Sequence, residues 1–106
     1  MHELVGATTP RHHDIYEALG RVIDPELGIA ITELGLVYKI GVEGDGVGVV
    51  MTLTVPGCPM HATIRGDVEQ AVRAVSWVRS VAVEVTFEPP WTPDRMSQEA
   101  RRQLGR

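Results

Sequence analysis

The chain has 106 residues, of which 43% are hydrophobic and 23% are charged. This length and composition allow one packed core and are too short for two ordinary domains, so we expect a single domain over residues 1–106. The formal net charge is -4, and the 14 acidic and 10 basic residues are spread along the chain. Because no Lys/Arg cluster is available to neutralise phosphates, nucleic acid is not an expected partner.

The N-terminal residues and the cysteine content narrow the class of protein further. Residues 1–13 contain neither a basic region nor an apolar region of a secretory signal, and no apolar run approaches the roughly 18 residues of a membrane span. We therefore expect a cytoplasmic protein with no membrane partner. The single cysteine excludes an internal disulfide framework, and alone it cannot complete a structural zinc site or a four-cysteine cluster site.

The first predicted element is an amphipathic helix that begins at Thr9 and Pro10. Its N-cap is a hydroxyl, and proline is well suited to the first helical position. We expect the helix to end at Asp24, because a residue that precedes proline is pushed out of helical geometry. A loop over residues 25–35 follows. The apolar stripe of the helix consists of Ile15, Ala18, Leu19, Val22 and Ile23.

Two alternating runs follow, and they predict a β-hairpin around the turn at residues 44–46. In the first run, Leu36, Tyr38, Ile40 and Val42 are expected on the buried face. In the second run, the buried face is expected to hold Val47, Val49, Met51, Leu53 and Val55.

A second helix, a third strand and a C-terminal segment complete the prediction. The helical stripe runs from Met60 to Val75, and residues 81–87 alternate as a strand. Prolines interrupt residues 89–93, and a short helix with Ser97 as its N-cap is expected within residues 94–104. Trp91 either anchors a partner or folds back onto the core, and folding back is favoured because the last helix needs a contact to hold it.

The element order is therefore α-β-β-α-β-α. We expect a two-layer α+β domain in which helices pack on one face of a three-stranded sheet, since this arrangement buries every apolar stripe. The core is expected over about residues 10–88, followed by a Pro/Trp linker and C-terminal helix over residues 89–106.

Cys58 is the leading candidate for chemistry. Pro59 is suited to the first position of the second helix, which places Cys58 at the N-cap beside unpaired N–H groups and the positive end of the helix dipole. Such an environment lowers the pKa of a thiol and favours the thiolate that attacks electrophiles and binds metals. The alternative is a small buried apolar cysteine.

Several neighbouring side chains are candidates for the same site. His61 follows Cys58 with the spacing Cys-x-x-His, which brings both within reach of one metal, although a solvated surface histidine is the alternative. Asp24, Glu26 and Glu33 offer carboxylates for metal or acid/base chemistry, with turn and loop hydrogen bonding as the competing interpretation.

The remaining polar candidates are two threonines and two histidines. Thr52 and Thr54 are predicted to line an exposed pocket with Cys58, although threonine is also simply a good strand former. His12 and His13 have no other histidine or cysteine nearby, so we interpret them as solvated.

Four ordered motifs together resemble one known family. They are DPELGI at 24–29, ELGLVY at 33–38, MTLTVPGCP at 51–59 and EPPWTPDRMSQEAR at 88–101. The chain is similar to the metal–sulfur cluster biosynthetic family, also called domain of unknown function 59, whose members include SufT and the phenylacetate-pathway protein PaaD. The resemblance implies a compact α/β domain that acts in iron–sulfur cluster assembly. It also implies a characteristic surface formed by Asp24, Glu26, Thr54 and Cys58, with Glu33 in the acidic-Leu-Gly-Leu motif.

The chain also departs from parts of this family. Val55 replaces a hydroxyl or small residue that is frequent in the family, and the cysteine-containing extension of PaaD-type proteins is missing. A stand-alone, SufT-like protein is therefore the closer comparison, and no Walker motif for ATP hydrolysis is present.

The functional prediction is an accessory factor, not an enzyme, for assembly or delivery of iron–sulfur clusters or metal centres. An iron–sulfur cluster normally takes four cysteine thiolates, so Cys58 is expected to bind iron or a cluster transiently, or to act as a docking thiol. A second copy in a homodimer, the assembly machinery or an apo client would complete the ligands. One alternative is a metal-free adaptor that positions clients. Another is a thiol enzyme with Cys58 as nucleophile and His61 as base.

Overall fold

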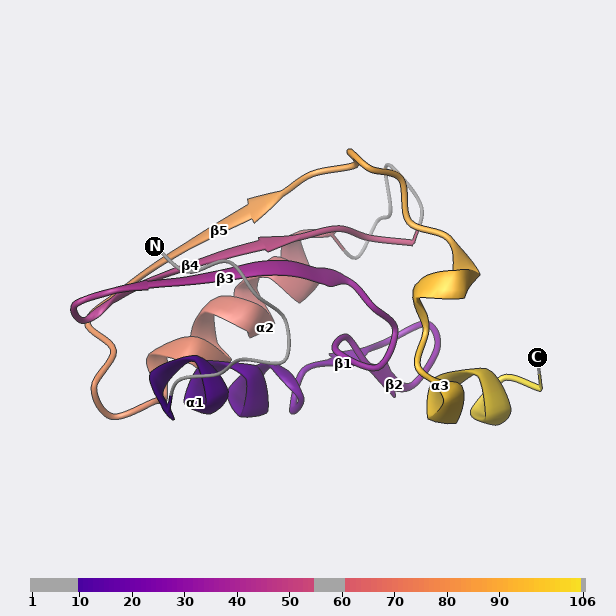
Figure 1. The fold of residues 1–106 in the computed structure, drawn as a ribbon, viewed down its shortest axis with the longest axis horizontal. Coiled ribbons are helices and arrows are strands. Elements are labelled where there is room, and N and C mark those ends of the chain that lie inside the picture. Colours follow the sequence, from indigo (N-terminus) through magenta and orange to yellow (C-terminus); the bar gives the residue numbers. More distant parts are fainter. Residues whose placement is uncertain (1–9, 55–60, 106) are drawn as a thin grey trace.

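The computed structural model describes residues 10–54 and 61–105, and of His61 it describes only the backbone. Its elements follow the predicted α-β-β-α-β-α order, with two short strands and a 3-10 helix added (Figure 1). In chain order they are α1 (Pro10–Leu19), β1 (Ile23–Asp24), β2 (Ile29–Ala30), β3 (Val37–Glu43), β4 (Gly46–Met51), α2 (His61–Arg73), β5 (Ser80–Val85), η1 (Pro93–Arg95) and α3 (Gln98–Gln103).

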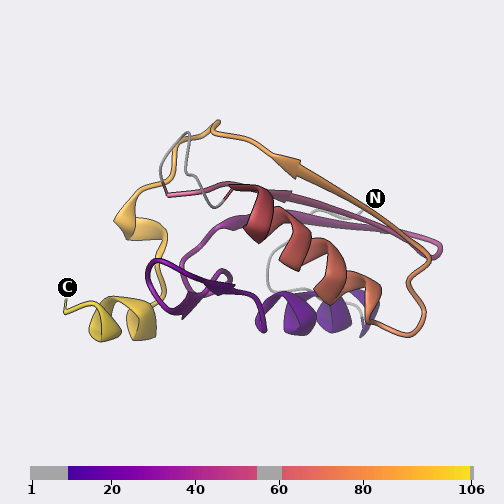
Figure 2. The same cartoon turned by 180° about the vertical axis from the view of Figure 1, so that it is seen from behind.

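The three long strands form one sheet with the order β3-β4-β5. β3 and β4 are antiparallel and are joined by a tight turn in which Gly44 has a φ of +62°. β5 pairs in parallel with β4, with Val83 opposite Val49. The parallel pairing requires a crossover, which α2 provides. Figures 1 and 2 show α1 and α2 on the same face of this sheet, so the predicted two-layer α+β fold is confirmed.

The first helix is shorter than predicted. It ends at Leu19 instead of Asp24, and the N–H of Val22 bonds to the carbonyl of Leu19 in a tighter turn. Gly20 is a poor helix former, and the carbonyl of Val22 accepts the N–H of Ile31. The pairing of Val22 with Ile31 therefore replaces the last predicted helical turn, and residues 25–35 contain a strand instead of only a loop.

A β-bulge changes the predicted alternation of the first long strand. The register shifts between Val37 and Lys39, so Leu36 and Val37 are both buried. Tyr38, which was predicted to point into the core, is half-buried and donates a 2.8 Å hydrogen bond to the carbonyl of Pro89. An extra residue at a bulge has this effect because it breaks the regular alternation of side chains between the two faces of the strand.

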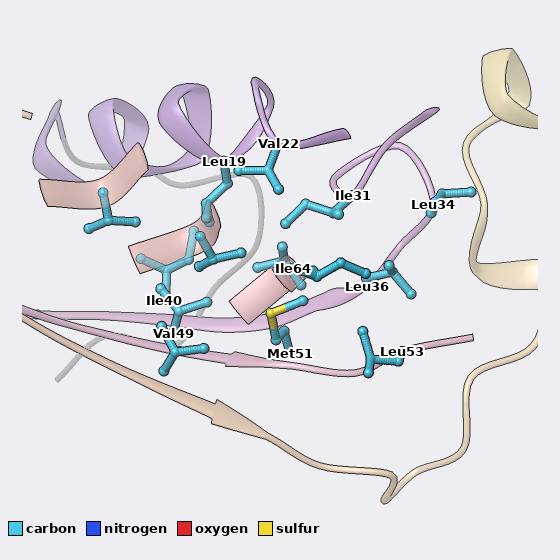
Figure 3. Packing of buried hydrophobic residues seen from close by; sticks show 14 of the residues in the cluster. Leu19, Val22, Ile31, Leu34, Leu36, Ile40, Val49, Met51, Leu53 and Ile64 are labelled. Carbon is cyan, nitrogen blue, oxygen red and sulfur yellow. The ribbon is translucent and has the colours of Figure 1, made fainter. Parts of the chain in front are cut away.

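The core lies between the sheet and the helices, where apolar side chains of both layers point toward one another (Figure 3). Ile64 of α2 is buried there as the sequence predicts. Buried residues continue past residue 88 to Met96, just before α3, and to Ala100 within it. His12 was predicted to be solvated, but it is only 3% exposed, because it lies on the buried side of α1.

Within residues 10–54 and 61–105, no helix combines the length and the apolar character that crossing a bilayer requires.

Candidate functional site

The β1–β2 hairpin gives Asp24 a defined structural task. Its Oδ1 accepts the N–H of Glu26 at 2.8 Å and that of Leu27 at 3.1 Å, and its own carbonyl accepts the N–H of Gly28 at 2.8 Å. Gly28 has a φ of +69°, which lets the chain reverse. Asp24 is 4% exposed, whereas Glu26 is exposed. The carboxylate of Asp24 thus organises the turn that presents Glu26.

Two substitutions distinguish the role of Asp24 as a hydrogen-bond acceptor from a role of its negative charge. Asp24→Ala removes the acceptor for two N–H groups and is expected to lower the free energy of unfolding by about 1–2 kcal/mol. Asp24→Asn keeps an acceptor oxygen and loses only the charge, so its urea midpoint should stay close to that of the parent protein. An equal loss of stability in both variants would contradict a turn-forming role.

Glu33 connects the chain before β3 to the C-terminal helix. Ser97 Oγ donates to Glu33 Oε1 at 2.6 Å, and the N–H of Ser97 donates to the carbonyl of Glu33 at 2.8 Å. Ser97 also caps the N-terminus of α3, as the sequence predicted, because its Oγ accepts the N–H of Ala100 at 3.1 Å. Burial, and secondarily the charge of Glu33, raises the pKa of Tyr16. Glu33 therefore joins the chain before β3 to the start of α3 through both its carboxylate and its backbone carbonyl.

Residues 33–36 and the C-terminal segment are packed directly against each other. The indole Nε1 of Trp91 donates to the carbonyl of Leu34 at 2.7 Å, which confirms that Trp91 folds back. Gly35 has a φ of +75°, and a Cβ at that position would lie 2.3 Å from the carbonyl oxygen of Arg95. The second and fourth motifs of the sequence are thus two sides of one contact.

The chain leaves β4 toward the segment that carries Cys58. Thr52 is completely buried and its N–H bonds to the carbonyl of Leu36 at 2.8 Å, so the prediction that Thr52 lines an exposed pocket is wrong. Thr54 is half-buried. Cys58, its predicted N-cap position and Val55 fall outside the described residues, as does the side chain of His61.

The described candidate residues do not share one turn: Asp24 and Glu26 belong to the β1–β2 hairpin, Glu33 precedes β3 and Thr54 follows β4. In both Figure 1 and Figure 2 the β1–β2 hairpin and the chain that leaves β4 lie in the half of the molecule that also carries α3. Within the part of the chain that the structure describes, no three histidine, cysteine, aspartate or glutamate side chains gather closely enough to hold a metal ion.

The open face of the sheet carries a groove that the sequence did not reveal. It has a volume of about 770 Å³, and its floor includes Lys39, Val50 and Glu84 from the three strands. Arg95 forms part of its wall and stacks over the ring of Tyr38, with its guanidinium carbon 4.8 Å from the ring centre. The bulge in β3 hides this arrangement from sequence patterns, because it changes the face on which Tyr38 lies.

The fold and these motifs define a class of protein. The model of the family described as iron–sulfur cluster assembly protein matches residues 12–85, so the chain belongs to this family. The resemblance inferred from the four motifs is therefore confirmed.

Individual relatives agree with this assignment. The chain is 47% identical to the Fe-S protein maturation auxiliary factor SufT of Staphylococcus aureus over 85 residues, which are 79% of this chain and 97% of the relative. It is 45% identical to an Fe-S protein maturation auxiliary factor of Porphyromonas gingivalis over 93 residues, 87% of this chain and 89% of the relative. A crystal structure of a domain of unknown function DUF59 from Bacillus anthracis superimposes with a TM-score of 0.85 at 40% identity, covering 90% of this chain and 92% of that one.

Proposed function

We propose that this protein is a non-enzymatic accessory factor that helps to assemble iron–sulfur clusters or deliver them to apo proteins. The observation that carries the proposal is the family match over residues 12–85, a span that contains the only cysteine of the chain. The relatives named maturation auxiliary factors support an auxiliary role in place of catalysis.

Within this function, Cys58 serves as a transient ligand or a docking thiol. An iron–sulfur cluster normally takes four cysteine thiolates, and this chain supplies one. The cluster is therefore cargo that two chains share. A second copy of this protein, a donor or an apo client supplies the other ligands, and His61 is the second candidate ligand in this chain.

The described side chains support this site by shaping its surroundings. Thr54 is half-buried and lies four residues before Cys58. Glu26 is held at an exposed position by the turn that Asp24 organises, and Glu33 anchors the C-terminal segment. In this proposal the surface that meets the cargo or the partner protein includes Glu26, Glu33, Thr54 and His61. The buried Asp24 supports this surface through the turn that it organises.

Anaerobic reconstitution with iron and sulfide tests the role of Cys58. The wild type is expected to develop cluster absorption and bind iron, and Cys58→Ala is expected to lose both, because a thiolate is the ligand that cluster iron requires. His61→Ala should retain the chromophore at a reduced iron content if the histidine is an auxiliary ligand.

A matched control separates a specific site from any exposed thiol. The double variant Cys58→Ala/Ser76→Cys carries the same number of cysteines, with the thiol moved to an exposed position after α2. Cluster absorption in this double variant equal to that of the wild type would contradict a specific site. No chromophore in any of the proteins, together with intact client maturation in cells, would favour a metal-free adaptor.

A further inference from the structure

A second groove lies between β1 and the last two turns of α2, away from the C-terminal contact. It has a volume of about 520 Å³ and is lined on one side by Ile23 and on the other by Ala71 and Ala74. Within residues 10–54 and 61–105 the exposed large apolar side chains are Ile23, at 47%, and Leu27, at 37%. A large apolar side chain therefore stands beside a shallow hollow floored by small ones.

Among residues 10–54 and 61–105 this groove is open to solvent, because its lining residues Ile23, Asp67 and Ala74 are exposed. In Figure 2, α2 faces the viewer, and among the elements drawn in colour none lies in front of it. The small side chains of Ala71 and Ala74 allow another backbone or side chain to approach the helix closely. The surface thus offers both a projecting apolar side chain, Ile23, and an apolar hollow at Ala71 and Ala74 that can receive such a side chain.

Two opposite charges flank the apolar centre. Arg21 lies on the same wall as Ile23, and Asp67 lies on the α2 wall. Both are exposed, and neither forms an ion pair with any other residue that the structure describes. The groove therefore presents one unmatched positive and one unmatched negative group.

We propose that this groove binds a second copy of the same chain in a two-fold symmetric dimer. In a two-fold interface every contact occurs twice, so one surface must complement itself. Here Ile23 of each copy fits against Ala71 and Ala74 of the other, and Arg21 of each copy faces Asp67 of the other. Because the positive group lies on one wall and the negative group on the other, a two-fold axis along the groove brings each charge opposite its counterpart in a second copy. This charge complementarity of the groove with itself is the reason for choosing a second copy as the occupant.

This inference deepens the proposed function, which uses two chains to complete the ligands of a cluster. It does not involve Cys58, so the two proposals fail separately. Dimerisation is measured on metal-free protein, and its absence would leave the cysteine-dependent binding of iron and sulfide unaffected.

Sedimentation velocity of the metal-free full chain at sub-millimolar concentration tests the proposal. The wild type should sediment with twice the mass of the 11.6 kDa chain. Ile23→Lys places a charge in the apolar centre and is expected to weaken dimerisation by at least about tenfold. Leu27→Lys is the matched control, because Leu27 is the other exposed large apolar residue and does not line the groove. A monomeric wild type, or an Ile23→Lys variant that dimerises like the wild type, would overturn the proposal.

A charge exchange gives the more specific test. Arg21→Glu and Asp67→Arg each place like charges opposite one another, so each should weaken the dimer by about tenfold at low salt. The double variant Arg21→Glu/Asp67→Arg restores opposite charges and should recover wild-type dimerisation. Because both substitutions are on exposed side chains, circular dichroism should show an unchanged fold in all three variants. A double variant no tighter than the single variants would overturn the paired arrangement.

Discussion

Gly35→Ala should lower the free energy of unfolding by about 3 kcal/mol, a large share of the roughly 5–15 kcal/mol that stabilises a typical domain. The left-handed φ of +75° costs an alanine about 1 kcal/mol. The added methyl would also lie 2.3 Å from the carbonyl oxygen of Arg95, so the C-terminal segment must move away. Its hydrogen bonds to Glu33 and Leu34 are then weakened or lost.

Gly44→Ala distinguishes the cost of the left-handed backbone from the cost of the clash with Arg95. Gly44 has a similar φ of +62°, but nothing lies within 4 Å of the position of its added Cβ. Its loss should therefore be about 1 kcal/mol, due to backbone strain alone. Urea unfolding measures both variants, and brief trypsin treatment tests whether the cleavage sites at Arg95 and Arg101 become accessible only in Gly35→Ala. Equal losses in both variants would contradict the close packing at Gly35.

Trp91→Ala is expected to have the second largest effect, with a loss of about 2 kcal/mol. The indole is half-buried against the core, so its removal should cost about half as much as removal of a fully buried tryptophan. The 2.7 Å hydrogen bond to the carbonyl of Leu34 is lost as well. The urea midpoint should fall, and the C-terminal segment should become sensitive to trypsin.

Trp91→Phe distinguishes packing from hydrogen bonding at the same position. Phenylalanine keeps much of the aromatic area but cannot donate to Leu34, so the expected loss is about 1 kcal/mol. Trp77→Phe is the matched control, because the indole of Trp77 donates at 3.0 Å to the exposed carboxylate of Asp14 instead. If Trp91→Phe were as stable as Trp77→Phe, the bond to Leu34 would contribute little.

Much of the fold follows from local sequence patterns. The 3.6-residue stripe through Ile64 and Val68 and the alternation through Val47 and Val49 predict a helix and a strand whose apolar sides are buried as expected. Their burial also explains why helices cover one sheet face. Periodicity reports which face of an element is buried, and this information is sufficient for the layer arrangement.

Other features depend on contacts between distant residues and could not be predicted. The end of α1 at Leu19 depends on the pairing of Val22 with Ile31, and the bulge near Tyr38 depends on how β3 meets β4. The bond between Glu33 and Ser97 joins residues 64 positions apart. No local pattern contains information on such pairs.

The sequence predicted the local contacts of the candidate site, but not the contacts that join distant parts of the chain. The turn-forming interpretation of Asp24 was available from the sequence, because an aspartate before proline commonly bonds the following N–H groups. The partner of Glu33 was not, since it comes from the other end of the chain. The role of Cys58 stays a prediction, because residues 55–60 lie outside the part of the chain that the structure describes.

Transfer of a reconstituted cluster to an apo iron–sulfur protein tests the central claim most directly. The wild type, reconstituted anaerobically and freed of unbound iron and sulfide, should restore the cluster of the acceptor faster than an equal amount of iron and sulfide in solution. The Cys58→Ala/Ser76→Cys variant should give no acceleration over that free mixture. Equal rates for the wild type, this variant and the free mixture would contradict the account, because the protein would then neither hold nor deliver the cluster through Cys58.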